Sequence, residues 1–178
     1  PEEQEPGRGI RTVARMQRFA LTKMLSDTYF HNFVTHLLEA AYQREVYNLI
    51  DAGKSFDAGK LSEIKRSVLE RFWGDAVEIN AGAELTWMRQ IHYYMGLYSY
   101  TYSAGLTIAT QAFLRVKAEE EGAVADWLEF LALGDKLEAA EAAALANVDI
   151  KTDQALQDTI HYLDEAVDHI ITLSKELA

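Results

Sequence analysis

Three observations predict an all-α fold, built as an irregular multi-helix bundle. The only prolines are Pro1 and Pro6, so the rest of the chain contains no residue that lacks a backbone donor and clashes with the preceding helical turn. Apolar residues recur every three or four positions along most of the chain, which is the period of a helix with one buried face. Neither the alternation typical of strands nor an internal repeat accompanies this pattern. Helices packed on helices are therefore expected.

The first helix is expected from Arg11 to about Ala52. Its apolar stripe includes Phe19, Tyr29 and Phe33, spaced as one face of a helix requires. The segment 51–59 then contains two glycines and several short polar residues, which compete with helical hydrogen bonds. A connection is expected there.

Glycines mark the ends of the next segments. A second helix, from about Leu61, is expected to end near Gly74, and Asn80-Ala-Gly82 interrupts the chain before a long third segment that starts near Ala83. Gly134-Asp135 separates two shorter helices, which are expected at 123–133 and 136–146. The alanine content of the second favours a helix.

Asn147–Ile150 is expected to form a turn before the last helix, which starts near Thr152. That helix carries an apolar seam for docking on other helices. The seam consists of Leu156, Ile160, Leu163, Val167, Ile170 and Leu177. The expected domain organisation is a flexible linker or cut end at residues 1–10, followed by one helical region at residues 11–178.

Charge and composition narrow the classes of partner. A formal net charge of −11 disfavours binding to nucleic acid or to an anionic membrane surface, because binders of both kinds cluster Lys and Arg. The chain contains no cysteine, which excludes disulfides and thiolate metal sites and fits a cytoplasmic location. It opens with proline in a polar run that lacks a signal-peptide pattern, so we expect a piece of a larger protein.

The candidate functional surface is Gln90–Leu114, a stretch without Asp, Glu, Lys or Arg. Its histidine, tyrosines, glutamines and glycines are too polar for a membrane span. Burial inside protein is the better account, but buried phenols need hydrogen-bond partners. Five tyrosines lie within ten residues there: Tyr93, Tyr94, Tyr98, Tyr100 and Tyr102. We therefore expect a polar ligand to contact some of them.

Two geometries are open for these tyrosines. In a helix Tyr94, Tyr98 and Tyr102 share a face, whereas in an extended segment Tyr98, Tyr100 and Tyr102 do. Gly96 and Gly105 bracket the region, and glycine there either breaks a helix or lets a ligand approach closely. The alternative is an aromatic packing stripe without a ligand.

Metal and nucleophile motifs are mostly absent from the sequence. His31 and His36 are five residues apart, and the H-E-x-x-H zinc motif does not occur. His36 and Glu39 form H-x-x-E rather than E-x-x-H, which argues against a ferritin-like dimetal site. A second candidate cluster lies on the last helix, where a solvated face is the favoured interpretation. Its members are His161, Glu165, Asp168 and His169.

Several motifs resemble the C-terminal region of oligoendopeptidase F, a family of thimet-type zinc oligopeptidases. IHYY, YSYTYSAG, WLEFLALG and NVD stand in the family's order and at sensible spacing, and the resemblance extends from about Tyr29 to the C-terminus. Ile91 replaces the family's usual proline, Gly134-Asp135 its double glycine, and Asn147 its glycine before Val-Asp. These departures put the geometry of the loops in doubt.

The resemblance implies part of a helical zincin-like fold that hydrolyses short peptides with zinc-activated water. Its zinc motif would lie in an N-terminal part of the same enzyme, so no metal ligand is expected in this chain and the chain alone is expected to be inactive. Matching motif positions gives His92, Tyr98 and Tyr102 catalytic roles and adds Tyr100 as a substrate-binding residue. From the groove considered above, Tyr94, Gly96 and Gly105 are also expected to bind substrate. The alternative function is a non-catalytic helical module whose tyrosine-lined groove binds a peptide or helix.

Overall fold

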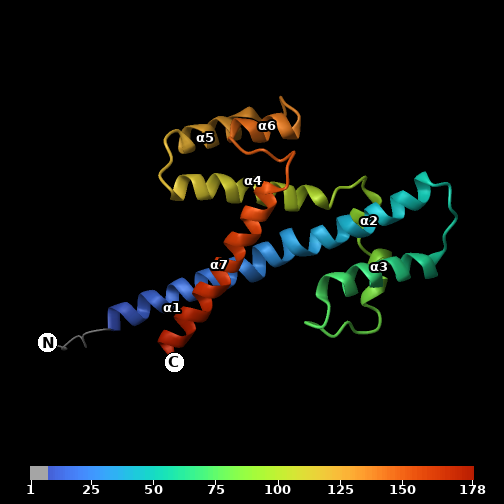
Figure 1. The fold of residues 1–178 in the computed structure, drawn as a ribbon, viewed down its shortest axis with the longest axis horizontal. Coiled ribbons are helices and arrows are strands. Elements are labelled where there is room, and N and C mark those ends of the chain that lie inside the picture. The colour runs from blue at the N-terminus through green and yellow to red at the C-terminus, as the bar shows by residue number, and fades with distance from the viewer. Residues whose placement is uncertain (1–7) are drawn as a thin grey trace. The chain divides into compact units, whose positions relative to one another are not determined.

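The computed structural model describes residues 8–178 and is 76% helical. No strand occurs among these residues, so the predicted all-α, multi-helix class is confirmed (Figure 1). Residues 1–7 of the predicted N-terminal linker lie outside the described part. The helices are α1 (Arg8–Lys23), a π-helix (Met24–Thr35), α2 (His36–Asp51), α3 (Ala58–Trp73), two 3-10 helices (Ala83–Met88 and Ile91–Tyr94), α4 (Tyr100–Lys117), α5 (Ala123–Leu133), α6 (Ala139–Leu145) and α7 (Gln154–Leu177).

The chain forms two compact units. The central unit is His31–Ala104, and the terminal unit combines residues 8–30 with Gly105–Ala178. The chain passes from one unit to the other within the π-helix and again within α4. No helix in residues 8–178 has both the length and the apolar character needed to cross a bilayer.

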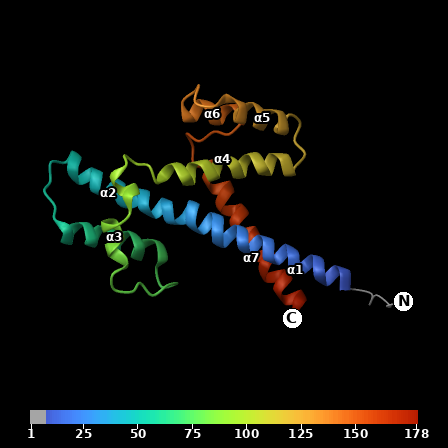
Figure 2. The same cartoon turned by 180° about the vertical axis from the view of Figure 1, so that it is seen from behind.

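In the terminal unit α1 lies against α7, and the two helices cross (Figure 2). The predicted seam on α7 is only partly buried, since Ile160 and Val167 are 47% and 44% exposed. The most buried side chains of α7 are instead mostly small, and small residues allow helices to approach closely. They are Ala155, Thr159, Ala166 and Leu173.

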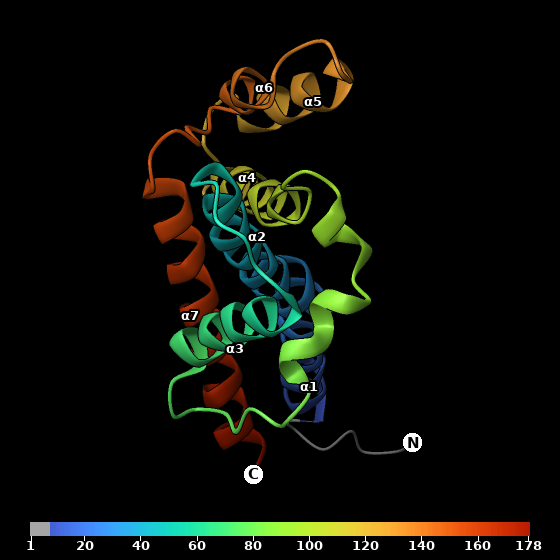
Figure 3. The ribbon, with the colours of Figure 1, turned by 90° about the vertical axis from the view of Figure 1, so that its right-hand side faces the viewer.

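The helices α5 and α6 lie side by side (Figure 3), and both pack against α4 in an apolar cluster that includes Ile108, Trp127 and Ala143. Arg115 on α4 fixes this arrangement, because its guanidinium donates to the carbonyl of Ala146 and to the carboxylate of Asp126, both at 2.8 Å. Asn147 has a φ of +56°, a left-handed conformation that asparagine tolerates better than most residues. The departure from the family's glycine at this turn is therefore compatible with the loop.

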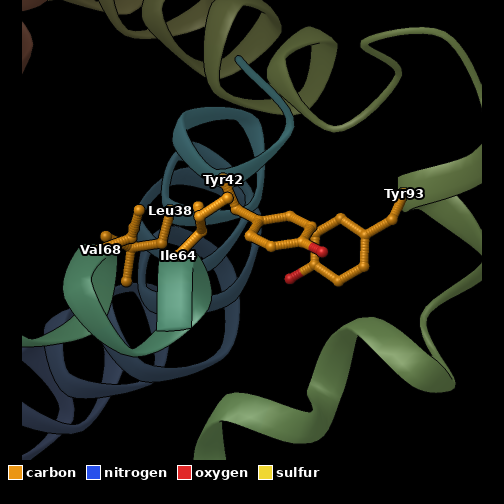
Figure 4. Close-up of a cluster of buried hydrophobic side chains, with 5 residues drawn as sticks. All are labelled: Leu38, Tyr42, Ile64, Val68 and Tyr93. Carbon is orange, nitrogen blue, oxygen red and sulfur yellow. The ribbon is translucent and has the colours of Figure 1, made fainter. Parts of the chain in front are cut away.

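In the central unit α3 packs against α2. Asp57 caps α3 by accepting a hydrogen bond from the backbone N–H of Lys60 at 2.8 Å, and Gly74 ends it with a φ of +51°. Figure 4 shows the side chains that form the core between these helices, together with one tyrosine from the second 3-10 helix. The core residues are Leu38, Tyr42, Ile64, Val68 and Tyr93.

The prediction of one long segment from about Ala83 is wrong for the residues before Tyr100. Two short 3-10 helices and a loop precede α4, which begins only at Tyr100. Gly96 and the run of aromatic residues give this segment weak helix propensity. Side chains from it also hydrogen-bond α2, and those contacts replace regular helical structure.

Candidate active site

The three predicted catalytic residues lie together in the central unit. The ring centroids of His92 and Tyr98 are 5.2 Å apart, those of His92 and Tyr102 5.8 Å, and those of the two tyrosines 5.4 Å. The hydroxyls of Tyr98 and Tyr102 are hydrogen-bonded at 3.2 Å. Tyr98 is 37% exposed and Tyr102 is half-buried, so the rings lie neither in bulk water nor in an apolar core.

A turn and a helix start bring these side chains together. His92 lies on the second 3-10 helix, and Leu97 then adopts a left-handed φ of +53° in the turn that leads to α4. Tyr98 and Tyr102 are four residues apart across the start of α4, a spacing that places side chains on one face. Of the three tyrosines predicted to share a helical face, only Tyr98 and Tyr102 do so, and Tyr94 does not.

The other predicted substrate-binding residues do not join this cluster. Tyr94 is 68% exposed and its hydroxyl donates to the carbonyl of Trp87 at 3.1 Å, while Tyr100 is exposed at the start of α4. Gly96 lies in an exposed turn, and Gly105 lies inside α4 without breaking it. Neither glycine has a positive φ. Their roles in binding substrate stay predictions.

A buried polar group from α2 contacts the cluster. The ring of His36 stacks on Tyr102 with centroids 4.1 Å apart, and the carboxylate of Glu39 accepts hydrogen bonds from Gln90 at 3.0 Å and from Ser99 at 2.8 Å. His36 and Glu39 are 2% and 5% exposed. Neither Glu39 nor Gln90 was predicted to belong to the site, and the only signal was one acidic residue inside the apolar run from Leu37 to Tyr42.

Hydrogen bonds set the protonation pattern of His92. The amide nitrogen of Gln90 donates to Glu39, whose carboxylate accepts, and this orients the amide. The same nitrogen lies 3.2 Å from Nδ1 of His92, so Nδ1 is the acceptor. A neutral His92 then carries its proton on Nε2, which becomes the donor of the ring. Its backbone carbonyl accepts from Gln43 at 3.1 Å, which fixes the main chain.

His36 has the opposite arrangement. Its Nδ1 lies 2.8 Å from the backbone carbonyl of His31, and a carbonyl can only accept. The Nδ1 atom is therefore protonated, and Nε2 of a neutral ring keeps its lone pair.

These tautomers make a donor set suited to a divalent metal. One ligand atom from each of His36, Glu39 and His92 lies within 4.8 Å of the others, and this is the only such set of three or more donors found in residues 8–178. Two imidazoles and a carboxylate fit the preferences of zinc in type and number. This set was not predicted from the sequence, because His92 is distant from the other two residues in the chain.

A pocket of about 340 Å³ lies beside this polar group within the central unit, and Gln43 lines it. The side-chain oxygen of Gln43 is buried without a hydrogen-bond partner in the described structure. The aromatic lining is Tyr42, Tyr47, Phe56, Trp87, Tyr93 and Tyr94. The aromatic lining suits an apolar group.

Several ionisable groups of the central unit have shifted pKa values. Burial lowers the pKa of Lys65 to about 8, and its ammonium donates to the hydroxyl of Tyr93 at 2.6 Å. Burial also raises the pKa of Tyr42 to about 12. The hydrogen bond to Tyr98 raises the pKa of Tyr102, so its hydroxyl keeps its proton at neutral pH.

The candidate cluster on α7 is a solvated face, as the sequence favoured. His161 and Glu165 lie 3.5 Å apart with side chains 74% and 62% exposed, and Asp168 and His169 are exposed as well. Exposed pairs of this kind contribute little to stability.

Comparisons with known proteins agree with the resemblance. No protein-family model matches the chain. The chain is 20% identical over 135 residues to Oligoendopeptidase F homolog of Borreliella burgdorferi, covering 76% of this chain and 23% of that protein. It is 26% identical over 143 residues to "Oligoendopeptidase F, plasmid" of Lactococcus lactis subsp. cremoris, covering 79% and 23%.

A solved structure shows the same fold. Oligoendopeptidase-F from Enterococcus faecium matches with a TM-score of 0.81 at 20% identity, over 92% of this chain and 31% of that chain. The present chain thus spans about 23% of the length of its curated relatives. The resemblance found in the sequence is confirmed: the chain is similar to oligoendopeptidase F proteins and matches their C-terminal region.

Proposed function

We propose that this chain is the C-terminal part of an oligoendopeptidase F-like zinc metalloendopeptidase that hydrolyses short peptides. Its contribution would be hydrogen-bond donors for the substrate and for the oxyanion that develops on the scissile carbonyl. The observation that carries the proposal is the convergence of His92, Tyr98 and Tyr102, whose rings lie within 6 Å of one another. The catalytic zinc, when bound through a motif outside this chain, supplies an activated water and polarises the carbonyl.

The chemistry of these groups suits that role. Two tyrosine hydroxyls joined by one hydrogen bond use one proton in that bond, so the other O–H is free to donate to a ligand. Nε2–H of His92 provides a further donor. Donors fixed in advance stabilise developing negative charge without reorganising, and losing one typically costs about 3 kcal/mol.

Other parts of the central unit support peptide binding. The aromatic pocket is large enough for an apolar side chain of a bound peptide.

The remainder of the enzyme is the proposed partner. On α1 of the terminal unit Ile10, Met16 and Phe19 are 67–77% exposed, and large apolar side chains on one helix are typical of a surface that another part of a protein covers.

Turnover of a short quenched-fluorescent peptide by the full-length protein tests the proposal. We expect His92→Ala and Tyr98→Phe each to lower kcat/KM by about 10²- to 10³-fold, and Tyr98→Phe should leave the zinc content unchanged. Tyr162→Phe, a matched change in the terminal unit, should retain the parent rate. Parent-like rates in both His92→Ala and Tyr98→Phe would refute the assignment, whereas peptide binding without turnover by the parent would favour the interaction module.

A further inference from the structure

We infer that His36, Glu39 and His92 form a divalent-metal site, with Zn²⁺ as the best-matched ion. None of the three residues belongs to an H-E-x-x-H motif, which does not occur in the chain. His36 and Glu39 occupy the first turn of α2, three residues apart, and His92 comes from the second 3-10 helix. Their ligand atoms lie within 4.8 Å of one another, and Nδ1 of His92 is 4.0 Å from Oε2 of Glu39.

The lone pairs needed for coordination are available. The carbonyl of His31 holds the proton of His36 on Nδ1, which leaves Nε2 to bind a metal. Nδ1 of His92 accepts a hydrogen bond from the Gln90 amide at 3.2 Å, so this atom also has a lone pair. A metal ion bound to Nδ1 would replace that hydrogen bond. Coordination through Nδ1 leaves Nε2–H of His92 free, so the site is compatible with the proposed function but does not depend on it.

The distances require only a small contraction. Zinc bonds of about 2.0–2.2 Å in a tetrahedron place ligand atoms about 3.4 Å apart. The three donors therefore need to approach by about 1.4 Å at most, which side-chain rotation provides. Three protein ligands leave a fourth position for water or another ligand.

The surroundings resemble those of metal sites. A ligating histidine usually donates its other N–H to a carbonyl or carboxylate, and ligating carboxylates are themselves hydrogen-bonded. His36 meets the first condition through His31, and Glu39 meets the second through Ser99.

Charge gives an independent reason for a cation. Glu39 is a buried carboxylate whose hydrogen bonds from Gln90 and Ser99 come from neutral groups. The ammonium of Lys65 attracts it through space but donates its own hydrogen bond to Tyr93. Burying an anion without a close positive partner is costly, and an ion bound to Glu39 removes that cost.

Metal titration of the purified, chelator-treated chain tests the inference without any activity assay. We expect one equivalent of Zn²⁺ by calorimetry, one equivalent of Co²⁺ with the visible spectrum of a low-coordinate site, and a higher Tm when Zn²⁺ is present. Glu39→Gln and His36→Ala should each weaken binding by at least about 100-fold, and Ser99→Ala by about 10- to 100-fold. The matched control is His161→Ala with His169→Ala, which removes the exposed imidazoles of α7 and should leave the affinity unchanged.

The results separate three outcomes. The site is supported if Glu39→Gln no longer binds one equivalent of Zn²⁺ while its circular dichroism matches that of the parent. The inference is overturned if only the α7 double variant loses Zn²⁺ binding. It is also overturned if both Glu39→Gln and His36→Ala bind Zn²⁺ with an affinity within threefold of the parent. Because this readout is metal binding by the chain, a failure here is distinct from a failure of the peptidase proposal.

Discussion

The phenol ring of Tyr102 stacks on the imidazole of His36, with centroids 4.1 Å apart and planes inclined by 28°. His36 is buried on α2 and held by the carbonyl of His31. The stack therefore fixes the ring of Tyr102, whose hydroxyl is hydrogen-bonded to that of Tyr98. The residue that fixes it belongs to α2 and not to the tyrosine-containing segment.

Removing the stack should slow the proposed peptidase. His36→Ala frees the Tyr102 ring, and an aromatic pair contributes about 1 kcal/mol, so we expect kcat to fall by about five- to tenfold in the full-length protein. His36→Phe restores a flat ring and should recover part of that loss. Steady-state kinetics with a fluorogenic peptide measure both variants, and equal rates for Ala, Phe and parent would show that the stack has no positioning role.

Gln90 should control the tautomer of His92. In the parent chain we expect nitrogen NMR of the imidazoles to show His92 protonated on Nε2 and His36 on Nδ1. Gln90→Leu removes the amide, and His92 is then expected to move its proton to Nδ1, toward Glu39 at 4.0 Å. A His92 that is protonated on Nδ1 already in the parent would contradict the hydrogen-bond network described here.

Lys65 should make stability depend on alkaline pH. Burial lowers its folded-state pKa from 10.5 to about 8, so between these values the unfolded chain holds a proton that the folded chain has released. Stability contributed at this position is therefore lowest below about pH 8 and rises as pH increases toward 10.5.

The comparison with Lys65→Met isolates this effect from other titrating groups. Relative to the variant, the parent should gain about 3 kcal/mol of unfolding free energy across this window. Urea unfolding at several pH values measures the difference. A difference that does not change with pH would mean that Lys65 titrates alike in both states.

Leu97 should be a strained position in the turn before α4. Its φ of +53° costs a side chain with a Cβ about 1–2 kcal/mol, which glycine avoids. We expect Leu97→Gly to change the unfolding free energy by less than about 1 kcal/mol, because relief of strain offsets lost contacts and added chain entropy. Leu97→Val should destabilise by about 1–2 kcal/mol, since a β-branched residue fits this region poorly.

Leu85 provides the matched control for this prediction. It has similar exposure on a 3-10 helix and a negative φ, so Leu85→Gly should lose more stability than Leu97→Gly. Equal losses at the two positions in urea unfolding would show that the turn at Leu97 stores no strain.

Local signals predicted much of the fold. The bounds of α5, 123–133, agree with the structure because Gly122 and Gly134 flank it with φ values of +83° and +66°, which few other residues adopt. The end of the second helix at Gly74 follows for the same reason. By contrast, the π-helix at Met24–Thr35 was not predicted, because an apolar spacing of three to four residues does not separate π from α geometry.

The sequence by itself determined that the chain is helical and where most helices end. It also pointed to His92, Tyr98 and Tyr102 as the residues to examine. These features could be predicted because the absence of proline, the positions of glycine and local motifs are properties of short segments. The tertiary structure decided that the segment before α4 is irregular and that Glu39, Gln90 and Ser99 hold it. It also brought His36 and Glu39 to His92. Those contacts join residues 50 or more positions apart, and their energy depends on burial, which no local spacing encodes.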